Sequence, residues 1–354
     1  MAIIQYPGLY PTLQETIDNA QPGDTILIAP NTSLSENLVI TTNNLTVEGP
    51  VSSNINSTAT PGGIGLVIHA DNVTVRGLAF YNYFIAVSII GNHNAIEDLF
   101  IVNSDRNHVS ILGDYNSMMD CKLNICQNAA VTVAGRYNVF MYNSITNCTH
   151  AIIGTYIPTI GCIFAYNVTR DCTAANYVIY TDGSDKNIFF KNVMDVSGYG
   201  ILGSFGRFVV CSNMINHCST GICLQSDCSN ISANSLVDCT NGIECSANST
   251  CVTGNSVQSG IYTGITINGN NNTVTDNVVY DYQNIGILLN GVCNKEECNK
   301  LCGNGTDLIV NEVGASTGCG CRALTDFLQD TFDTDESFLD MLDIFKRRDS
   351  GKKK

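Results

Sequence analysis

The segment Asn213-Met-Ile-Asn-His-Cys-Ser-Thr-Gly-Ile222 is followed 21 residues later by a second version of itself, Asn234-Ser-Leu-Val-Asp-Cys-Thr-Asn-Gly-Ile243. Each version begins with asparagine, has an apolar residue two positions later and a cysteine five positions later, and ends in Gly-Ile. Related units fill the stretch from Asn138 to Asn290, with a period of 21 to 25 residues. Self-similarity at such a short period indicates a solenoid.

The units are too short for a pair of helices, and their β-branched strings are interrupted by Asn and Gly. We therefore expect one turn of a parallel β-helix per unit, in an all-β fold. Two columns of identical residues follow from the repeat. The asparagine column is Asn143, Asn167, Asn192, Asn213, Asn234, Asn255 and Asn277, and the cysteine column is Cys126, Cys148, Cys172, Cys218 and Cys239.

Both columns are predicted to be structural ladders. The asparagine amides should bond to the coils above and below at a tight turn. The cysteines should stack about 4.8 Å apart as small buried hydrophobic side chains. That spacing also permits disulfides, but a reducing cytosol argues against them.

The ends of the chain differ from the repeat. Residues 1–30 are predicted to form a cap and first strand, in which Thr12 and Glu15 mark the start of an amphipathic helix. Residues 31–291 should form the β-helix. Residues 292–321 form a cysteine-rich segment, and residues 322–354 are predicted to form an acidic amphipathic helix with a basic tail, which either covers the end of the solenoid or binds a partner.

The run Leu13-Gln14-x-x-Ile17-Asp18-x-Ala20-x-Pro22-Gly23-Asp24-Thr25-Ile26 resembles the opening of right-handed parallel β-helix proteins of the pectin-lyase-like superfamily. The later Asn and Gly-Ile units are similar to the generic β-helix repeats of that superfamily. The resemblance covers roughly residues 10–291. It implies the right-handed β-helix fold but no particular activity.

The composition of the chain limits the classes of partner that the protein can bind. Charged residues make up 14% of the chain and the net charge is −15, which argues against nucleic acid. No stretch approaches the roughly 20 apolar residues of a membrane span, and no signal peptide is visible. We expect synthesis in the cytosol, with a surface assembly such as a spore layer or virion as a destination.

Candidate catalytic residues are few. Arg76, Asp98 and Asp120 fall at similar phases of successive units, where they would form either a calcium or acid–base site for an acidic sugar or a solvated ladder. Asp171 and Asp182 lie near two enlarged coils, as do the tyrosines that would contact a glycan: Tyr156, Tyr166, Tyr177 and Tyr180.

Signature motifs of catalysis are missing. The sequence has none of the strings typical of glycoside hydrolases on this fold, and the catalytic Arg and acids of the calcium-dependent lyases have no clear counterpart. The five histidines, at positions 69, 93, 108, 150 and 217, have no partner that spacing identifies.

A second group of cysteines lies beyond the repeat: Cys293, Cys298, Cys302, Cys319 and Cys321. Three interpretations remain open. The cysteines are ligands of a structural zinc ion, they form disulfides within the cap or between subunits, or they are surface thiols.

The sequence thus favours a structural or assembly protein that self-associates, for which the C-terminal cysteines offer a means of cross-linking, and it favours the absence of enzymatic activity. The alternative is a polysaccharide lyase, a glycoside hydrolase or a glycan-binding module that uses the lateral face of the β-helix. That alternative rests on the fold resemblance and on the enlarged coils.

Overall fold

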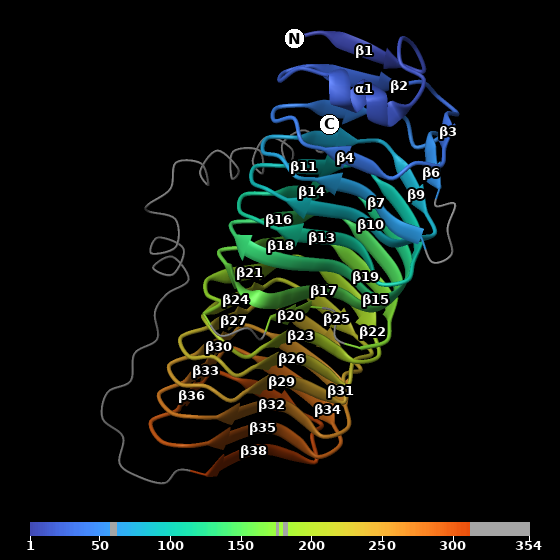
Figure 1. Cartoon of the computed structure of the whole chain (residues 1–354). Helices are drawn as coiled ribbons and strands as arrows, with labels where there is room; N and C mark the ends of the chain where they lie inside the picture. Colours follow the sequence, from blue (N-terminus) through green and yellow to red (C-terminus); the bar gives the residue numbers. More distant parts are fainter. Residues whose placement is uncertain (57–61, 175–176, 180–182, 312–354) are drawn as a thin grey trace, which may run out of the picture.

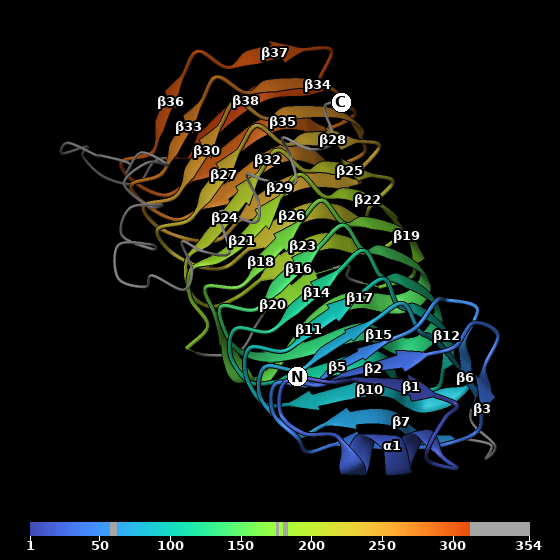
Figure 2. The ribbon, with the colours of Figure 1, turned by 90° about the horizontal axis from the view of Figure 1, so that it is seen from above.

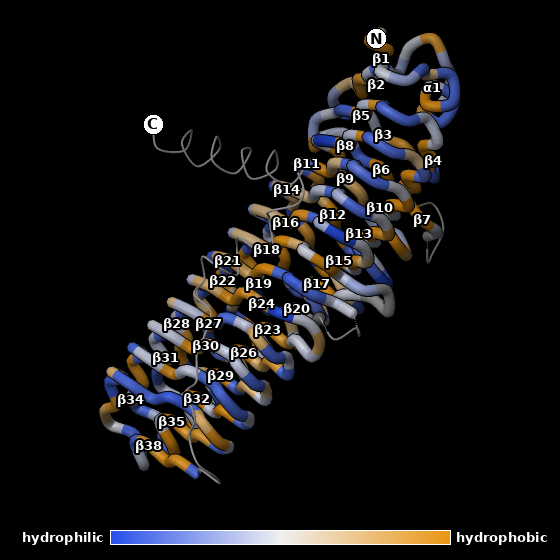
Figure 3. Tube along the Cα trace, turned by 90° about the vertical axis from the view of Figure 1, so that its left-hand side faces the viewer, coloured by the Kyte–Doolittle hydropathy of each residue, from blue (hydrophilic) through white to orange (hydrophobic). Residues whose placement is uncertain are grey.

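The computed structural model describes residues 1–56, 62–174, 177–179 and 183–311, without the side chains of residues 155–157 and 177–179. These residues form a right-handed parallel β-helix of about 13 turns, which confirms the predicted fold. The coils stack along one axis into a rod (Figure 1). Apolar and polar residues alternate along each coil of the rod (Figure 3). No helix in the described part of the chain is long and apolar enough to cross a membrane.

The strands of the coils form three parallel rows, and successive members of each row pair in parallel. The first row is the 14-stranded sheet, called sheet A here. It comprises β1 (Ile3–Tyr6), β2 (Thr25–Ile28), β5 (Thr46–Glu48), β8 (Thr74–Arg76), β11 (Ala95–Glu97), β14 (Ser117–Met119), β16 (Val139–Met141), β18 (Ile163–Ala165), β21 (Asn187–Phe190), β24 (Phe208–Cys211), β27 (Asn230–Ser232), β30 (Cys251–Thr253), β33 (Thr273–Thr275) and β36 (Lys295–Glu297).

The other two rows belong to one 24-stranded sheet, because β15 (Lys122–Arg136) and β17 (Ser144–Ile160) run through both rows. Beside β15 and β17, the second row comprises β3 (Ser33–Leu34), β6 (Asn54–Asn56), β9 (Ala79–Tyr81), β12 (Phe100–Ser104), β19 (Val168–Cys172), β22 (Val193–Val196), β25 (Met214–Asn216), β28 (Ser235–Val237), β31 (Ser256–Gly260), β34 (Val278–Tyr282) and β37 (Lys300–Cys302). The third row comprises β4 (Leu38–Ile40), β7 (Gly62–Ile68), β10 (Tyr83–Ile90), β13 (Asn107–Leu112), β20 (Tyr177–Ile179), β23 (Tyr199–Gly203), β26 (Thr220–Leu224), β29 (Asn241–Cys245), β32 (Thr263–Asn268), β35 (Ile285–Asn290) and β38 (Thr306–Asn311).

A short helix covers the N-terminal end of the rod. Helix α1 (Leu13–Asn19) begins where predicted: Thr12 is the N-cap, and its hydroxyl accepts the Glu15 N–H at 3.1 Å. Figure 2 shows α1 at the blue end of the stack. The Gln14 side-chain amide bonds to both the N–H and the carbonyl of Val39, which occupy the edge of β4. The helix thereby satisfies part of an otherwise open strand edge. The structure adds one strand to the predicted cap, since β1 pairs with β2.

Inward-facing side chains fill the rod with one apolar layer per coil. Phe140, Phe164 and Phe189 stack at ring-centroid distances of 5.1 and 4.9 Å, and Phe208 continues the stack at 6.2 Å. All four are fully buried. Phe140, Phe164 and Phe189 are register partners, because each coil presents the same position to the next. Phe208 reaches the stack from a position two residues out of that register.

The asparagine column lies inside the corner between sheet A and the second row. Asn213 is representative: its backbone N–H and its side-chain NH₂ both donate to Oδ1 of Asn234, at 2.9 and 3.0 Å. The same NH₂ donates to the carbonyl of Phe189 in the preceding coil. Asn213 Oδ1 in turn accepts from Asn192. Each amide therefore ties three coils together.

The β-helix is longer than predicted. The prediction placed its end at residue 291, but β36, β37 and β38 pair in parallel with β33, β34 and β35. Asn299 also extends the asparagine column, since it accepts the N–H of Asn277. The predicted cysteine-rich segment thus begins inside the last described coil. The segment 322–354 lies outside the described residues.

Candidate functional site

The cysteine column lies in the rod interior. Its five members are at most 4% exposed. Cys126 and Cys148 are register partners in adjacent strands. Cys172 is partnered by Val196, which interrupts the column before Cys218 and Cys239. All five are free thiols in the structure.

The C-terminal cysteines that the structure describes are spread over the last coil. Cys293 precedes β36 and is buried, Cys298 follows β36 and is exposed, and Cys302 ends β37 and is exposed. They do not form a metal-binding group of three among the described residues. Cys319 and Cys321 lie outside the described residues, so zinc and cross-linking at this end stay predictions.

Arg76 is not the partner of Asp98. Its guanidinium pairs with Glu48, because the two side chains are register partners in β8 and β5. Asp98 and Asp120 each occupy the turn directly after a sheet A strand, in adjacent coils, with φ values of 52° and 56°. The next coils place Tyr142, Tyr166 and Lys191 at the same turn. The predicted column of acids therefore exists, but it continues into tyrosines.

Tyr166 is engaged within the protein. Its ring stacks on Tyr142 at 5.0 Å, and the ammonium group of Lys191 lies 5.3 Å above the ring centroid. These rings pack against outward-facing apolar side chains of sheet A, which form a cluster separate from the rod core: Met119, Val139, Met141, Ile163, Ala165, Ile188 and Val209. With one face of its ring already covered, Tyr166 is a poor sugar platform.

The remaining candidates are dispersed. Asp171 is exposed at the end of β19, a different corner of the coil from Asp120. Asp182 and Tyr180 lie outside the described residues, as do the side chains of Tyr156 and Tyr177. Among the described candidates, Asp98 and Asp120 share one turn in adjacent coils, whereas Asp171 lies at another corner.

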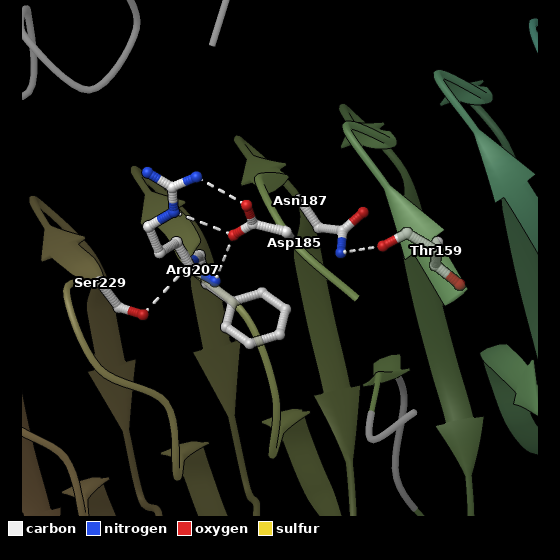
Figure 4. A network of polar contacts seen from close by, with 6 residues as sticks. Thr159, Asp185, Asn187, Arg207 and Ser229 are labelled. Atoms are coloured by element: carbon white, nitrogen blue, oxygen red, sulfur yellow. Dashed lines mark hydrogen bonds and ion pairs between the residues drawn. The ribbon is translucent and has the colours of Figure 1, made fainter. Parts of the chain in front are cut away.

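An ion pair that the sequence did not reveal lies beside the second enlarged coil. Arg207 donates to Asp185 through Nε at 3.0 Å, through Nη2 at 2.6 Å and through its backbone N–H at 2.9 Å (Figure 4). Burial raises the pKa of Asp185, but the hydrogen bonds and charge of Arg207 outweigh it and hold that pKa below its usual value. Because the two side chains bond to each other across neighbouring coils, we assign this pair a structural role.

A row of three titratable side chains lies on the outer surface where β22, β25 and β28 end. Nδ1 of His217 is 2.9 Å from Oδ1 of Asp195 in one neighbouring coil, and its Nε2 is 3.8 Å from Oδ2 of Asp238 in the other. All three side chains are at least half exposed. The sequence analysis identified no partner for the histidines, whereas His217 has two in the structure. Its partners follow from the period, since the three positions are 22 and 21 residues apart.

The two carboxylates set the protonation of His217. The hydrogen bond and the charge of Asp195 raise its pKa, and Asp238 adds a smaller contribution. Near neutral pH the imidazole therefore carries its proton more often than a free histidine. Arg170 is exposed at the register position one coil before Asp195. The surface thus offers a proton donor between two acceptors, with a guanidinium nearby.

Comparison with known proteins gives a partial match to one family model and likenesses to solved structures. Residues 163–313 match the model of the family described as periplasmic copper-binding protein (NosD). No curated protein sequence matches the chain.

Three solved structures share the fold. The A-module of the Azotobacter vinelandii mannuronan C-5 epimerase AlgE4 has a TM-score of 0.51 at 10% identity, covering 86% of this chain and 95% of that one. A PL6 alginate lyase has a TM-score of 0.50 at 13% identity, covering 90% and 86%. The catalytic domain of a GH87 α-1,3-glucanase has a TM-score of 0.50 at 12% identity, covering 83% and 65%. At these identities the likeness shows the fold alone. The chain is a right-handed parallel β-helix repeat protein.

Proposed function

We propose that this protein binds a polysaccharide along the lateral face of the β-helix and acts on it through the row Asp195, His217 and Asp238. The observation that carries the proposal is the exposed imidazole between two carboxylates, because proton transfer to or from a sugar needs a side chain that titrates near neutral pH. The similarity in fold to enzymes of mannuronan, alginate and α-1,3-glucan supports the polysaccharide class.

His217 is the proton donor in this mechanism. Asp195 holds Nδ1, so Nε2 is the nitrogen that faces Asp238 and incoming substrate. The imidazolium delivers its proton to the oxygen of the bond that breaks. A second carboxylate close to the donor would then stabilise positive charge or accept a proton from water, which is the role that a carboxylate has in glycoside cleavage.

The net charge of the protein affects which polysaccharides can approach it. With a net charge of −15 the protein repels polyanions at low ionic strength. A neutral glycan avoids that repulsion, whereas a uronate polymer would need a counter-charge, for which Arg170 is the nearest exposed cation along the row. Neutral glucans are therefore the first substrates to test, and alginate the second.

The test is a screen of neutral and acidic polysaccharides for new reducing ends and for unsaturated products, repeated with His217→Gln. We expect the substitution to lower the rate by about 10²- to 10⁴-fold without loss of the fold. His93→Gln is the matched control, since His93 is also exposed at a turn but stacks on Tyr115 instead of bonding to a carboxylate. Unchanged activity in His217→Gln would remove this row from the mechanism. If no glycan is bound or cleaved by the wild-type protein, the proposal fails altogether.

The assembly interpretation stays a prediction. Its described support is limited to the exposed thiols of Cys298 and Cys302 at one end of the rod.

A further inference from the structure

A fully buried histidine lies against two members of the cysteine column. His108 in β13 is 0% exposed, and Cys126 and Cys148 are 4% and 2% exposed. The candidate ligand atoms of the three side chains, an imidazole nitrogen and two sulfurs, all lie within 4.8 Å of one another. It is the single group of this kind among the described residues.

One ring nitrogen of His108 has a hydrogen-bond partner in the structure and the other has none. Nδ1 of His108 is 2.8 Å from the hydroxyl of Ser104, the residue in register with Cys126. Nε2 is buried and has no hydrogen-bond partner. Unpaired buried polar atoms are rare in folded proteins, because each forfeits its bonds to water. An imidazole whose Nδ1–H donates to a hydroxyl keeps a lone pair on Nε2, as in histidines that bind metals.

The protonation states agree with this arrangement. Burial lowers the pKa of His108 to about 3, although the Asn124 carbonyl opposes the shift, so the ring is neutral at physiological pH. Contact with the sulfur of Cys148 lowers the pKa of Cys126 and raises that of Cys148. Besides contacting each other, the two thiols donate to backbone carbonyls: those of Arg106 and Ala129 for Cys126, and that of Thr146 for Cys148.

We propose that His108, Cys126 and Cys148 form a buried binding site for a thiophilic d¹⁰ cation, either Cu(I) or Zn(II). Two thiolates and an imidazole are the donor set that such cations prefer. No fourth histidine, cysteine or carboxylate joins the group among the described residues, which favours Cu(I), because zinc in closed structural sites takes four ligands. The site lies outside residues 163–313, so it does not rest on the family match.

Binding has a defined proton balance. Cysteine binds metal as thiolate, so a cation that enters the site displaces up to two protons while His108, already neutral, releases none. The cation also pairs the orphan Nε2. Since the site is closed to solvent, it should fill while the chain folds, and the bound cation then stabilises the folded state.

The protein itself offers a matched control. Cys218 and Cys239 are also buried, neighbouring members of the column, and the pKa of Cys218 is raised by contact with Cys239 just as that of Cys148 is raised by Cys126. In the part of the chain that the structure describes, no histidine joins that pair in a metal-binding group. Loss of metal should therefore follow removal of the first pair and not of the second.

The experiment is refolding of the full chain, reduced and under anaerobic conditions, with one equivalent of Cu(I) or Zn(II), followed by removal of loose metal with a chelator and metal analysis. We expect about one equivalent of metal in the wild type and in Cys218→Ser/Cys239→Ser, and less than about a tenth in Cys126→Ser/Cys148→Ser. Ser104→Ala should weaken affinity roughly 10- to 100-fold, as loss of an outer partner of a ligating histidine does. Retention of Cu(I), Zn(II) or both at this site supports the proposal and identifies the cation.

A second measurement covers the case in which the double variant does not fold. Wild-type protein is pulsed with denaturant and an alkylating agent, with and without metal, and the labelled cysteines are mapped by mass spectrometry. Metal should protect Cys126 and Cys148 but leave Cys218 and Cys239 as reactive as before. Equal protection of both pairs, or no metal retained by the wild type, overturns the proposal.

Discussion

The strands β22, β25 and β28 begin and end with two rows of different character. At their start lie Asn192, Asn213 and Asn234, which are buried and identical. At their end lie Asp195, His217 and Asp238, which are exposed and varied. Both rows connect neighbouring coils through side-chain contacts, so what separates them is access to water.

The difference follows from what each corner must satisfy. Inside the rod, an amide must accept two N–H groups from the preceding coil, donate to a carbonyl of that coil and donate to the next coil. Asparagine meets all of these demands with a short side chain. On the outside, water satisfies whatever the side chain leaves unpaired. Uniform ladders therefore mark the scaffold, and departures from uniformity on the surface mark candidate functional positions.

The rod core should show the largest loss of stability, against which substitutions in the two rows can be compared. Phe164→Ala removes a ring stacked between Phe140 and Phe189, and we expect a loss of about 3–5 kcal/mol in the free energy of unfolding because the neighbouring coils cannot collapse into the cavity. Denaturant unfolding measures it. A loss below about 1 kcal/mol would mean that the coils are loosely packed and that neither corner is rigid.

Asn213→Ala tests the inner row directly. The substitution leaves the Phe189 carbonyl and the N–H of Asn192 without their partners in a dry interior, and we expect a cost of about 2–3 kcal/mol. Asn268→Ala is the control, since Asn268 bonds to Asn290 and Ser246 on the exposed side of β32. It should change stability by less than about 0.5 kcal/mol. Equal costs at both positions would refute the role assigned to burial.

Arg207→Gln tests a pair of intermediate exposure. We expect a loss of about 1 kcal/mol at pH 7, reduced by partial solvent screening. The pKa of Asp185 is depressed in the folded state, so its stabilising contribution is present above the unfolded pKa of about 3.9 and is lost as the pH falls through the lower folded value. The difference between wild type and variant should therefore shrink in acid, measured by urea unfolding from pH 7 to pH 2.5.

His217→Gln should have the smallest effect on stability, below about 0.5 kcal/mol, because its partners are exposed. The pKa of His217 is raised by folding, so the stabilisation is fully present below the unfolded value of about 6.5 and disappears as the pH rises through the folded value. Urea unfolding at pH 5.5 and pH 9 separates the two conditions. A large loss at pH 9 would show that the histidine serves packing and not protonation.

The sequence predicted the scaffold better than the site, for a physical reason. Asparagine recurs at the same position of consecutive units. This spacing alone places Asn213 between Asn192 and Asn234, without knowledge of how the turn folds. The same period would have paired His217 with Asp195 and Asp238, but a row of unlike residues is hard to recognise as a row.

Other features needed the folded chain. His108 meets Cys126 because His108 lies in the third row and Cys126 lies in the second-row part of β15, across one corner of the coil. No spacing in the sequence encodes that contact. The predicted end at residue 291 was too early because Lys295, Glu296 and Glu297 form a strand although all three are charged. Asn299 nevertheless continues the asparagine column at the expected spacing.

The parallel stacking of the coils has a mechanical consequence. The hydrogen bonds between coils run along the rod axis, so a force that pulls the two ends apart acts on one inter-coil interface at a time instead of on the whole sheet. The rod should therefore unfold one coil at a time. Each rupture would free 21 to 25 residues, roughly 7–9 nm of extended chain, in nearly equal steps along most of its length.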